Sequence, residues 1–148
     1  MTGHPPRDLD EALDALGPDG GSAEIADPRG HIEVEASEVD RLGVRIEGVR
    51  IRFQAPRDVA RECERLPGDL RELGEAVAPV EVDPVLGGGI LRTRPDDMRD
   101  REYFEVGVRP DRAEIRRYRV GADGGRERAD WTLTRDQLRR LIDGICGD

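Results

Sequence analysis

The stretch from Tyr103 to Ile145 constrains the fold most strongly, because strand patterns lead there into a helix with a well-marked start. Every second position is apolar at Phe104, Val106 and Val108, which is the period of a half-buried β-strand. The sequence Arg109-Pro110-Asp111-Arg112 follows and suits a tight turn, because proline presets the backbone angle of the second turn residue. The pattern therefore predicts a strand that ends in a hairpin turn.

A second strand is predicted after this turn, from Ala113 to Val120. Ile115 is out of phase with Tyr118 and Val120 within that strand. A bulge at positions 116–117 would restore the alternation, so we expect one there.

A third strand and a closing helix follow a glycine-rich turn. The strand places Ala129, Trp131 and Leu133 on one face. Thr134 as N-cap, with Gln137 three residues later, forms a capping box that marks the start of the helix. The helix carries one apolar stripe, formed by Leu138, Leu141, Ile142 and Ile145. These elements predict an antiparallel meander with a helix packed against it.

The N-terminal half is also expected to combine a helix with strands, although the two halves do not share residue spacing. Asp8 is expected to cap a short helix, and two strands joined by a turn are expected at 23–26 and 31–36. Apolar alternation continues from Val44 to Phe53 with a phase slip at Glu47-Gly48. Two interpretations fit the slip: one long strand with a bulge, which we favour, or two short strands joined by a tight hairpin.

Two helices and an edge strand are expected between these halves. Helical spacing predicts a helix from Asp58 to Leu66, ended by Pro67-Gly68, and a shorter helix over 69–77. Positions 79–83 are predicted as an edge strand, because Pro84 at its end cannot donate a hydrogen bond to a neighbouring strand. Positions 92–100 are charged and predicted as an exposed loop.

These patterns predict an α+β fold, in which a mainly antiparallel meander sheet carries helices packed largely on one face. A length of 148 residues suits a single domain, which we place at residues 8–148. Residues 1–7 are polar and contain two prolines, so we expect a flexible N-terminus there.

The charge of the chain narrows the classes of partner. The chain carries 33 acidic residues and 24 basic residues, all of them arginine, and its formal net charge is -9. We therefore expect no nucleic-acid partner, because such binding depends on a basic surface. A protein partner is expected instead, and a basic one would complement the charge. No apolar segment reaches the length of a membrane span, so we expect no membrane association and a cytoplasmic location.

Six arginines on two predicted strand regions are the candidate ligand-binding or partner-binding residues. They are Arg45, Arg50, Arg52, Arg116, Arg117 and Arg119. An arginine-rich sheet face could hold an anionic ligand or an acidic peptide, because guanidinium groups bind oxyanions bidentately. The alternative is cross-strand pairing with glutamates, namely Glu33, Glu35, Glu105 and Glu114. The sequence leaves both interpretations open.

Residues suited to catalysis or metal binding are few. The carboxylates of Asp96–Glu102 lack the spacing of a calcium loop, and His31 has no neighbouring nucleophile in the sequence. Cys63 lies on an apolar helical stripe and is expected to be buried, whereas Cys146 near the end of the chain could be exposed. The glycines at 87–89 lack the Gly-Lys-Ser/Thr ending of a phosphate-binding loop. We predict no catalytic residue, no metal and no cofactor.

These observations favour a small acidic non-enzymatic protein-interaction module, such as an adaptor, a chaperone-like factor or an inhibitor. Exposed sheet edges offer one mode of binding, because a strand of a partner, including a second copy in a homodimer, can add to them. The alternative is a small enzyme that uses the Asp96–Glu102 carboxylates or His31 in a cleft. A third class is an acidic mimic that occupies a nucleic-acid-binding protein.

Overall fold

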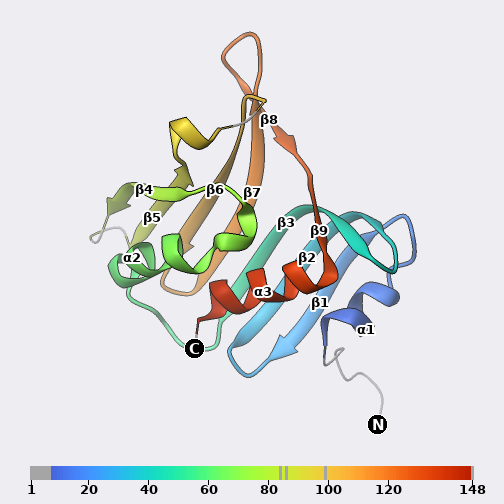
Figure 1. The fold of residues 1–148 in the computed structure, drawn as a ribbon. Helices are drawn as coiled ribbons and strands as arrows, with labels where there is room; N and C mark the ends of the chain where they lie inside the picture. Colours follow the sequence, from blue (N-terminus) through green and yellow to red (C-terminus); the bar gives the residue numbers. More distant parts are fainter. Residues whose placement is uncertain (1–7, 84, 86, 99, 148) are drawn as a thin grey trace.

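Figure 1 shows the fold in a computed structural model, which describes residues 8–83, 85, 87–98 and 100–147. Within these residues, nine antiparallel strands form one sheet in the order β1-β2-β3-β7-β6-β5-β4, with β8 beside β7 and β9 beside β3. The strands are β1 (Gly21–Asp27), β2 (Gly30–Val39), β3 (Gly43–Phe53), β4 (Val77–Asp83), β5 (Gly88–Thr93), β6 (Glu102–Arg109), β7 (Arg112–Val120), β8 (Arg126–Ala129) and β9 (Trp131–Thr134). The predicted antiparallel sheet is confirmed, and residues 1–7, the expected flexible N-terminus, lie outside the described residues.

Two meanders, β1-β2-β3 and β4-β5-β6-β7, meet along β3 and β7. These strands pair only between 49–52 and 112–115, and then they diverge. β8 pairs with the later part of β7, and β9 pairs with the earlier part of β3. Only Asp130 separates β8 from β9, so one bent segment lies between the diverging strands (Figure 1). The single third strand of the sequence pattern is therefore divided in two.

The two phase slips in the sequence have different structural explanations. β3 is one continuous strand with a bulge at Glu47, because Glu35 pairs with Gly48 while Ala36 pairs with Ile46. The long bulged strand is thus confirmed. The bulge predicted at 116–117 is wrong, because β7 pairs with β6 without interruption through this region.

Arg117 explains the apparent slip in β7. It faces the apolar side, in register with the buried Phe104, and its guanidinium lies 4.3 Å from the centre of the Phe104 ring. An arginine stem can cover apolar surface while its charge is paired elsewhere, so no bulge is needed to bring an apolar residue to this position. Tyr118 consequently lies on the opposite side, next to Tyr103, with ring centroids 5.8 Å apart.

Three helices accompany the sheet in the described residues. They are α1 (Leu9–Asp14), α2 (Val59–Asp69) and α3 (Arg135–Cys146), with two 3-10 turns, η1 (Arg71–Leu73) and η2 (Pro95–Asp97). None of the described helices has the length and apolar character needed to cross a membrane.

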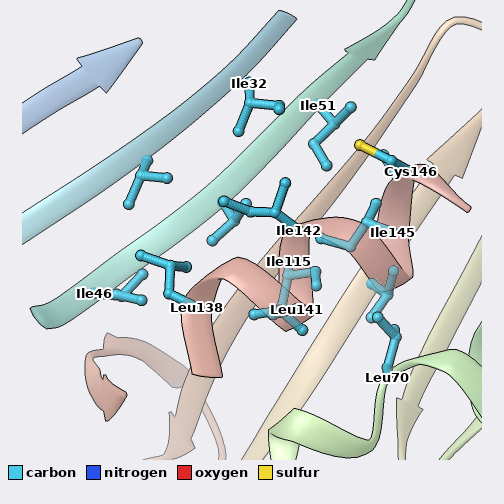
Figure 2. Close-up of a cluster of buried hydrophobic side chains, with 14 of the residues drawn as sticks. Ile32, Ile46, Ile51, Leu70, Ile115, Leu138, Leu141, Ile142, Ile145 and Cys146 are labelled. Atoms are coloured by element: carbon cyan, nitrogen blue, oxygen red, sulfur yellow. The ribbon is translucent and has the colours of Figure 1, made fainter. Parts of the chain in front are cut away.

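The start of α3 is as predicted. Thr134 Oγ1 accepts a hydrogen bond from Gln137 N at 3.0 Å, and Gln137 Oε1 accepts one from Thr134 N at 2.9 Å. These two bonds satisfy backbone donors that would otherwise have no partner at the helix start. The predicted stripe of four apolar residues is buried, and Figure 2 shows these residues facing isoleucines of the sheet, including Ile46, Ile51 and Ile115.

The region after α2 departs from expectation. Pro67 does not end α2, which continues to Asp69, and Leu70 N donates to Leu66 O at 3.0 Å. A proline removes one helical hydrogen bond, but burial of Leu66 and Leu70 favours completing the last turn. The second helix expected at 69–77 is only the short η1, after which β4 begins.

Both cysteines are buried, so the expectation that Cys146 could be exposed is wrong. The apolar stripe of α3 extends one position beyond Ile145 and carries Cys146 into the core (Figure 2). Cys63 lies against β5, where a Cβ added to Gly89 would be 2.6 Å from the Cys63 Sγ. Burial raises the pKa of both thiols, which makes them poor nucleophiles.

Candidate functional site

The side chains that alternate with the buried residues of β3, β5, β6 and β7 form what we call the polar face of the sheet. On β3, for example, Arg50 and Arg52 alternate with the buried Val49, Ile51 and Phe53. Most polar-face positions are charged, so this side of the strands cannot join the core. The polar face is therefore the side of these strands that is available for binding.

A hollow of about 400 Å³ lies on the polar face over β4 to β7. Gly107 lies in its centre, because it pairs with Ile90 on one side and Glu114 on the other, and all three line the hollow. A Cβ placed on Gly107 would meet no atom within 4 Å. The missing side chain in the middle of β6 therefore contributes directly to the open space.

Charges on one side of the hollow neutralise one another in what we call the paired row, Glu33, Arg50 and Glu114. These residues are direct cross-strand partners on β2, β3 and β7. Arg50 lies 3.0 Å from the Glu114 carboxylate and 4.0 Å from that of Glu33. Arg116 forms a further ion pair with Glu114. Burial opposes ionisation of Glu114, but the hydrogen bonds from Arg50 and Arg116 outweigh it and lower the pKa of this carboxyl.

A second row crosses the same strands two residues away, and its charges are all positive. Arg52, Arg112 and Arg109, which we call the arginine row, are consecutive cross-strand partners on β3, β7 and β6, and His31 is the partner of Arg52 on β2. Residues directly opposite one another in an antiparallel sheet have Cβ atoms roughly 5 Å apart, and like charges there repel.

Carboxylates do not compensate the arginine row. Among the described residues, Arg52 and Arg109 form no ion pair, and Arg112 has only its exposed neighbour Asp111 at 3.9 Å. Both Arg109 and Arg112 line the hollow. Arg109 and Arg112 therefore place adjacent positive charges at the rim of the hollow, whose lining also includes four carboxylates, those of Glu81, Asp83, Glu105 and Glu114.

The turn that carries two of these arginines is held in place by backbone hydrogen bonds. Pro110 O accepts from Arg57 N at 2.8 Å, and Asp111 O accepts from Phe53 N at 2.8 Å. The Arg57 guanidinium lies 4.1 Å from the centre of the Phe53 ring. Arg109 and Arg112 thus project from a fixed turn, which reduces the entropy that ordering a site would cost.

The six arginines singled out in the sequence do not come together at one place. Arg50 and Arg116 meet on Glu114, and Arg117 and Arg119 meet on Glu102. Arg45 lies apart from these pairs, 3.4 Å from Asp130. Of the six, only Arg52 forms no ion pair within the part of the chain that the structure describes.

The glutamates considered as their partners are largely engaged. Glu33 lies near Arg50, Glu35 lies 3.9 Å from Arg116, and Glu114 holds both arginines. Glu105 instead pairs with Arg92 at 2.9 Å and with Arg126 at 3.1 Å. The binding role of the six arginines stays a prediction. Arg52 is the best placed of them to bind a ligand, because the other five are paired with carboxylates.

Arg117 belongs to a separate cluster on the apolar side of β7. Its guanidinium lies 3.0 Å from the Glu75 carboxylate and 2.9 Å from that of Glu102, and all three side chains are largely buried. Burial opposes ionisation of Glu102, but hydrogen bonds from Arg117 and Arg119 lower the pKa of this carboxyl. This cluster ties the segment between η1 and β4 to the sheet, which is a structural role.

The other residues considered for catalysis do not line the hollow. His31 lies 3.7 Å from Glu24, and both side chains are exposed. Asp97 accepts a hydrogen bond from Ala76 N at 3.1 Å, while Glu102 is held by arginines. No group of three or more His, Cys, Asp or Glu side chains suited to a metal ion occurs in the described residues.

The free edge formed by β4 exposes valines between a proline and two carboxylates. β1 and β4 are the two ends of the sheet order, and β4 exposes Val80 and Val82 at 56% and 39%. Val85, just beyond β4, is 92% exposed. A bulge at Val80 interrupts the pairing of β4 with β5, because Pro79 pairs with Leu91 and Glu81 with Ile90.

The sequence analysis did not single out three residues of this surface, namely Gly107, Arg109 and Arg112. The two arginines could have been predicted to lie side by side, because the residues that flank a two-residue hairpin turn are directly opposite each other on one face. Arg109-Pro110-Asp111-Arg112 has this form. For Gly107 the signal was weaker, since a glycine in a strand pattern only suggests a bulge or a close approach.

Comparison of the chain with protein-family models, with curated proteins and with solved structures found no match.

Proposed function

We propose that this protein is a non-enzymatic interaction module that takes up an extended segment of a partner protein along the edge strand β4. The observation that carries the proposal is the exposure of Val80 and Val82 on an unpaired sheet edge. Sheet edges offer free backbone donors and acceptors, and soluble proteins usually protect them with charges or prolines. β4 contains Pro79, Glu81 and Asp83, but its exposed valines offer apolar contact to an added strand, whose main-chain hydrogen bonds provide affinity.

The remaining exposed surface supports this choice of edge. Of the four large hydrophobic side chains exposed in the described residues, only Leu42 lies away from β4 and the residues next to it. The other edge strand, β1, presents Ser22 and Glu24 and buries Ala23 and Ile25. A strand added at β1 would therefore gain little apolar contact.

The proposal treats residues 8–148 as one domain, with the helices on one side of the sheet and the polar face open on the other. The partner segment is expected to carry basic residues, because Glu81 and Asp83 alternate with Val82 along β4. This preference is consistent with the net charge of -9. A cytoplasmic location is part of the same proposal.

The test compares Val82→Lys with Leu42→Lys, which places the same charge on an exposed leucine outside β4. Light scattering of the purified protein and both variants first shows whether the protein self-associates. Partners are then captured from a lysate of the source organism on wild-type protein and on both variants. A partner or self-association lost in Val82→Lys and kept in Leu42→Lys supports the proposal. Equal retention by both variants would exclude the β4 edge.

A further inference from the structure

The arginine row and the hollow beside it remain unexplained by the proposed interaction function. Arg52, Arg112 and Arg109 repel one another across three adjacent strands, although glutamates are plentiful in this chain. One row away, Arg50 instead has a carboxylate as its cross-strand partner on each side. Uncompensated like charges that converge beside a cavity are typical of a binding site for the opposite charge.

We propose that Arg52, Arg109 and Arg112 bind the oxyanion group of a small ligand, and that the rest of the ligand occupies the hollow above Gly107. Guanidinium groups present paired N–H donors that match a carboxylate or phosphate group. Arg112 is central to the site, because it lies between Arg52 and Arg109 in the row. The anchored Pro110–Asp111 turn holds Arg109 and Arg112 in position.

The volume and lining of the hollow indicate the size, polarity and charge of the part of the ligand beyond its oxyanion group. Its volume of about 400 Å³ exceeds the space that a bare oxyanion needs and falls within the range of small-molecule sites. Ile90 and Tyr118 provide apolar and aromatic contact, and Gly107 leaves the centre open. Four carboxylates, those of Glu81, Asp83, Glu105 and Glu114, line it as well and disfavour a second negative charge. The ligand class is therefore a compact molecule with one oxyanion group and an uncharged, partly apolar body.

The experiment measures binding of defined probes to isotope-labelled protein by NMR, at constant ionic strength maintained with chloride. Inorganic phosphate probes the arginine row alone, phenyl phosphate adds an apolar body, and benzoate replaces the phosphate by a carboxylate. We expect amide shifts around Arg52 and the Arg109–Arg112 turn. Phenyl phosphate is expected to bind about tenfold more tightly than inorganic phosphate, because its ring is removed from water. The tighter of phenyl phosphate and benzoate identifies the preferred oxyanion.

Two variants separate the parts of the site. Arg112→Gln should weaken all three probes at least about tenfold, because it removes a charge-assisted donor. Gly107→Val should remove the advantage of phenyl phosphate and leave inorganic phosphate binding unchanged, because it fills only the hollow. A valine is compatible with a strand, so this variant is expected to fold.

The control is Arg61→Gln, which removes an exposed arginine of α2 that forms no ion pair among the described residues. It should leave all affinities unchanged. The proposal is overturned if the probes shift no amides near the arginine row, or if Arg61→Gln weakens binding as much as Arg112→Gln does. Val82→Lys should bind the probes normally, so the anion site and the proposed β4 interface can fail independently.

Discussion

The paired row and the arginine row both cross β3 and β7 on the polar face. Neighbouring charges in the paired row are opposite and attract, whereas those in the arginine row are alike and repel. Arg50 has Glu33 and Glu114 as its cross-strand neighbours, whereas Arg52 has His31 and Arg112. The two arginines are two positions apart on β3. Attraction within the paired row stabilises the folded state, and repulsion within the arginine row destabilises it.

This difference shows that the number of arginines on a strand says little about binding. What matters is the residue directly opposite, because cross-strand neighbours are the closest charges on a sheet surface. An arginine between two carboxylates has its donors occupied. An arginine between two arginines keeps its donors for solvent or for a ligand.

The largest effect is expected for Glu114→Ala, which leaves Arg50 and Arg116 without their shared partner. We expect a loss of about 2 kcal/mol in the free energy of unfolding, because charged hydrogen bonds in a half-buried site are lost. Chemical denaturation would measure it. Glu127→Ala is the control, since Glu127 is exposed on β8 without an ion pair in the described residues, and it should change stability by less than about 0.5 kcal/mol. Equal effects would contradict the importance of the paired row.

Acid should remove part of the same contribution. The folded protein lowers the pKa of Glu114 below its ordinary value of 4.5, so its carboxylate stabilises the fold above that pH. Stability is lost as the pH falls from 4.5 through the lowered pKa. Thermal melting between pH 6 and pH 3 should therefore show a shallower decline for Glu114→Gln than for the wild type. A parallel decline in both proteins would assign the acid sensitivity to other carboxyls, such as Glu62.

Arg50→Gln should cost less than the loss of Glu114. We expect about 1 kcal/mol, because Arg50 is partly exposed and Glu114 retains its ion pair with Arg116. Denaturation at low ionic strength measures the change. Unaltered stability would show that the paired row is held by Arg116 alone.

Arg112→Gln should have the smallest effect and the opposite sign. Removing the central charge of the arginine row relieves repulsion with both neighbours, and we expect a gain of about 0.5 kcal/mol. The gain should shrink in 1 M salt, because screening weakens interactions between exposed charges. A loss of stability at low salt would mean that Arg112 makes a favourable contact that outweighs the repulsion.

Local patterns predicted the elements whose ends and faces are determined by neighbouring residues. Thr134 and Gln137 marked the start of α3, and Glu47-Gly48 marked the bulge of β3. Prediction failed where a long-range contact decided the outcome. Arg117 faces the apolar side because Glu75 and Glu102 neutralise it there, and Pro67 remains helical because Leu66 and Leu70 are buried.

The sequence by itself determined the alternation of buried and exposed side chains, the hairpin turns and the helix caps, because these depend on residues close together in the chain. It also determined that arginines and carboxylates are both numerous. Only the tertiary structure decided which arginines pair with carboxylates. Cross-strand register, set by packing of strands far apart in sequence, placed Arg50 between two glutamates and Arg112 between two arginines. The same register placed Gly107 between Ile90 and Glu114 and opened the hollow beside them, since every partner across a sheet is chosen by the fold.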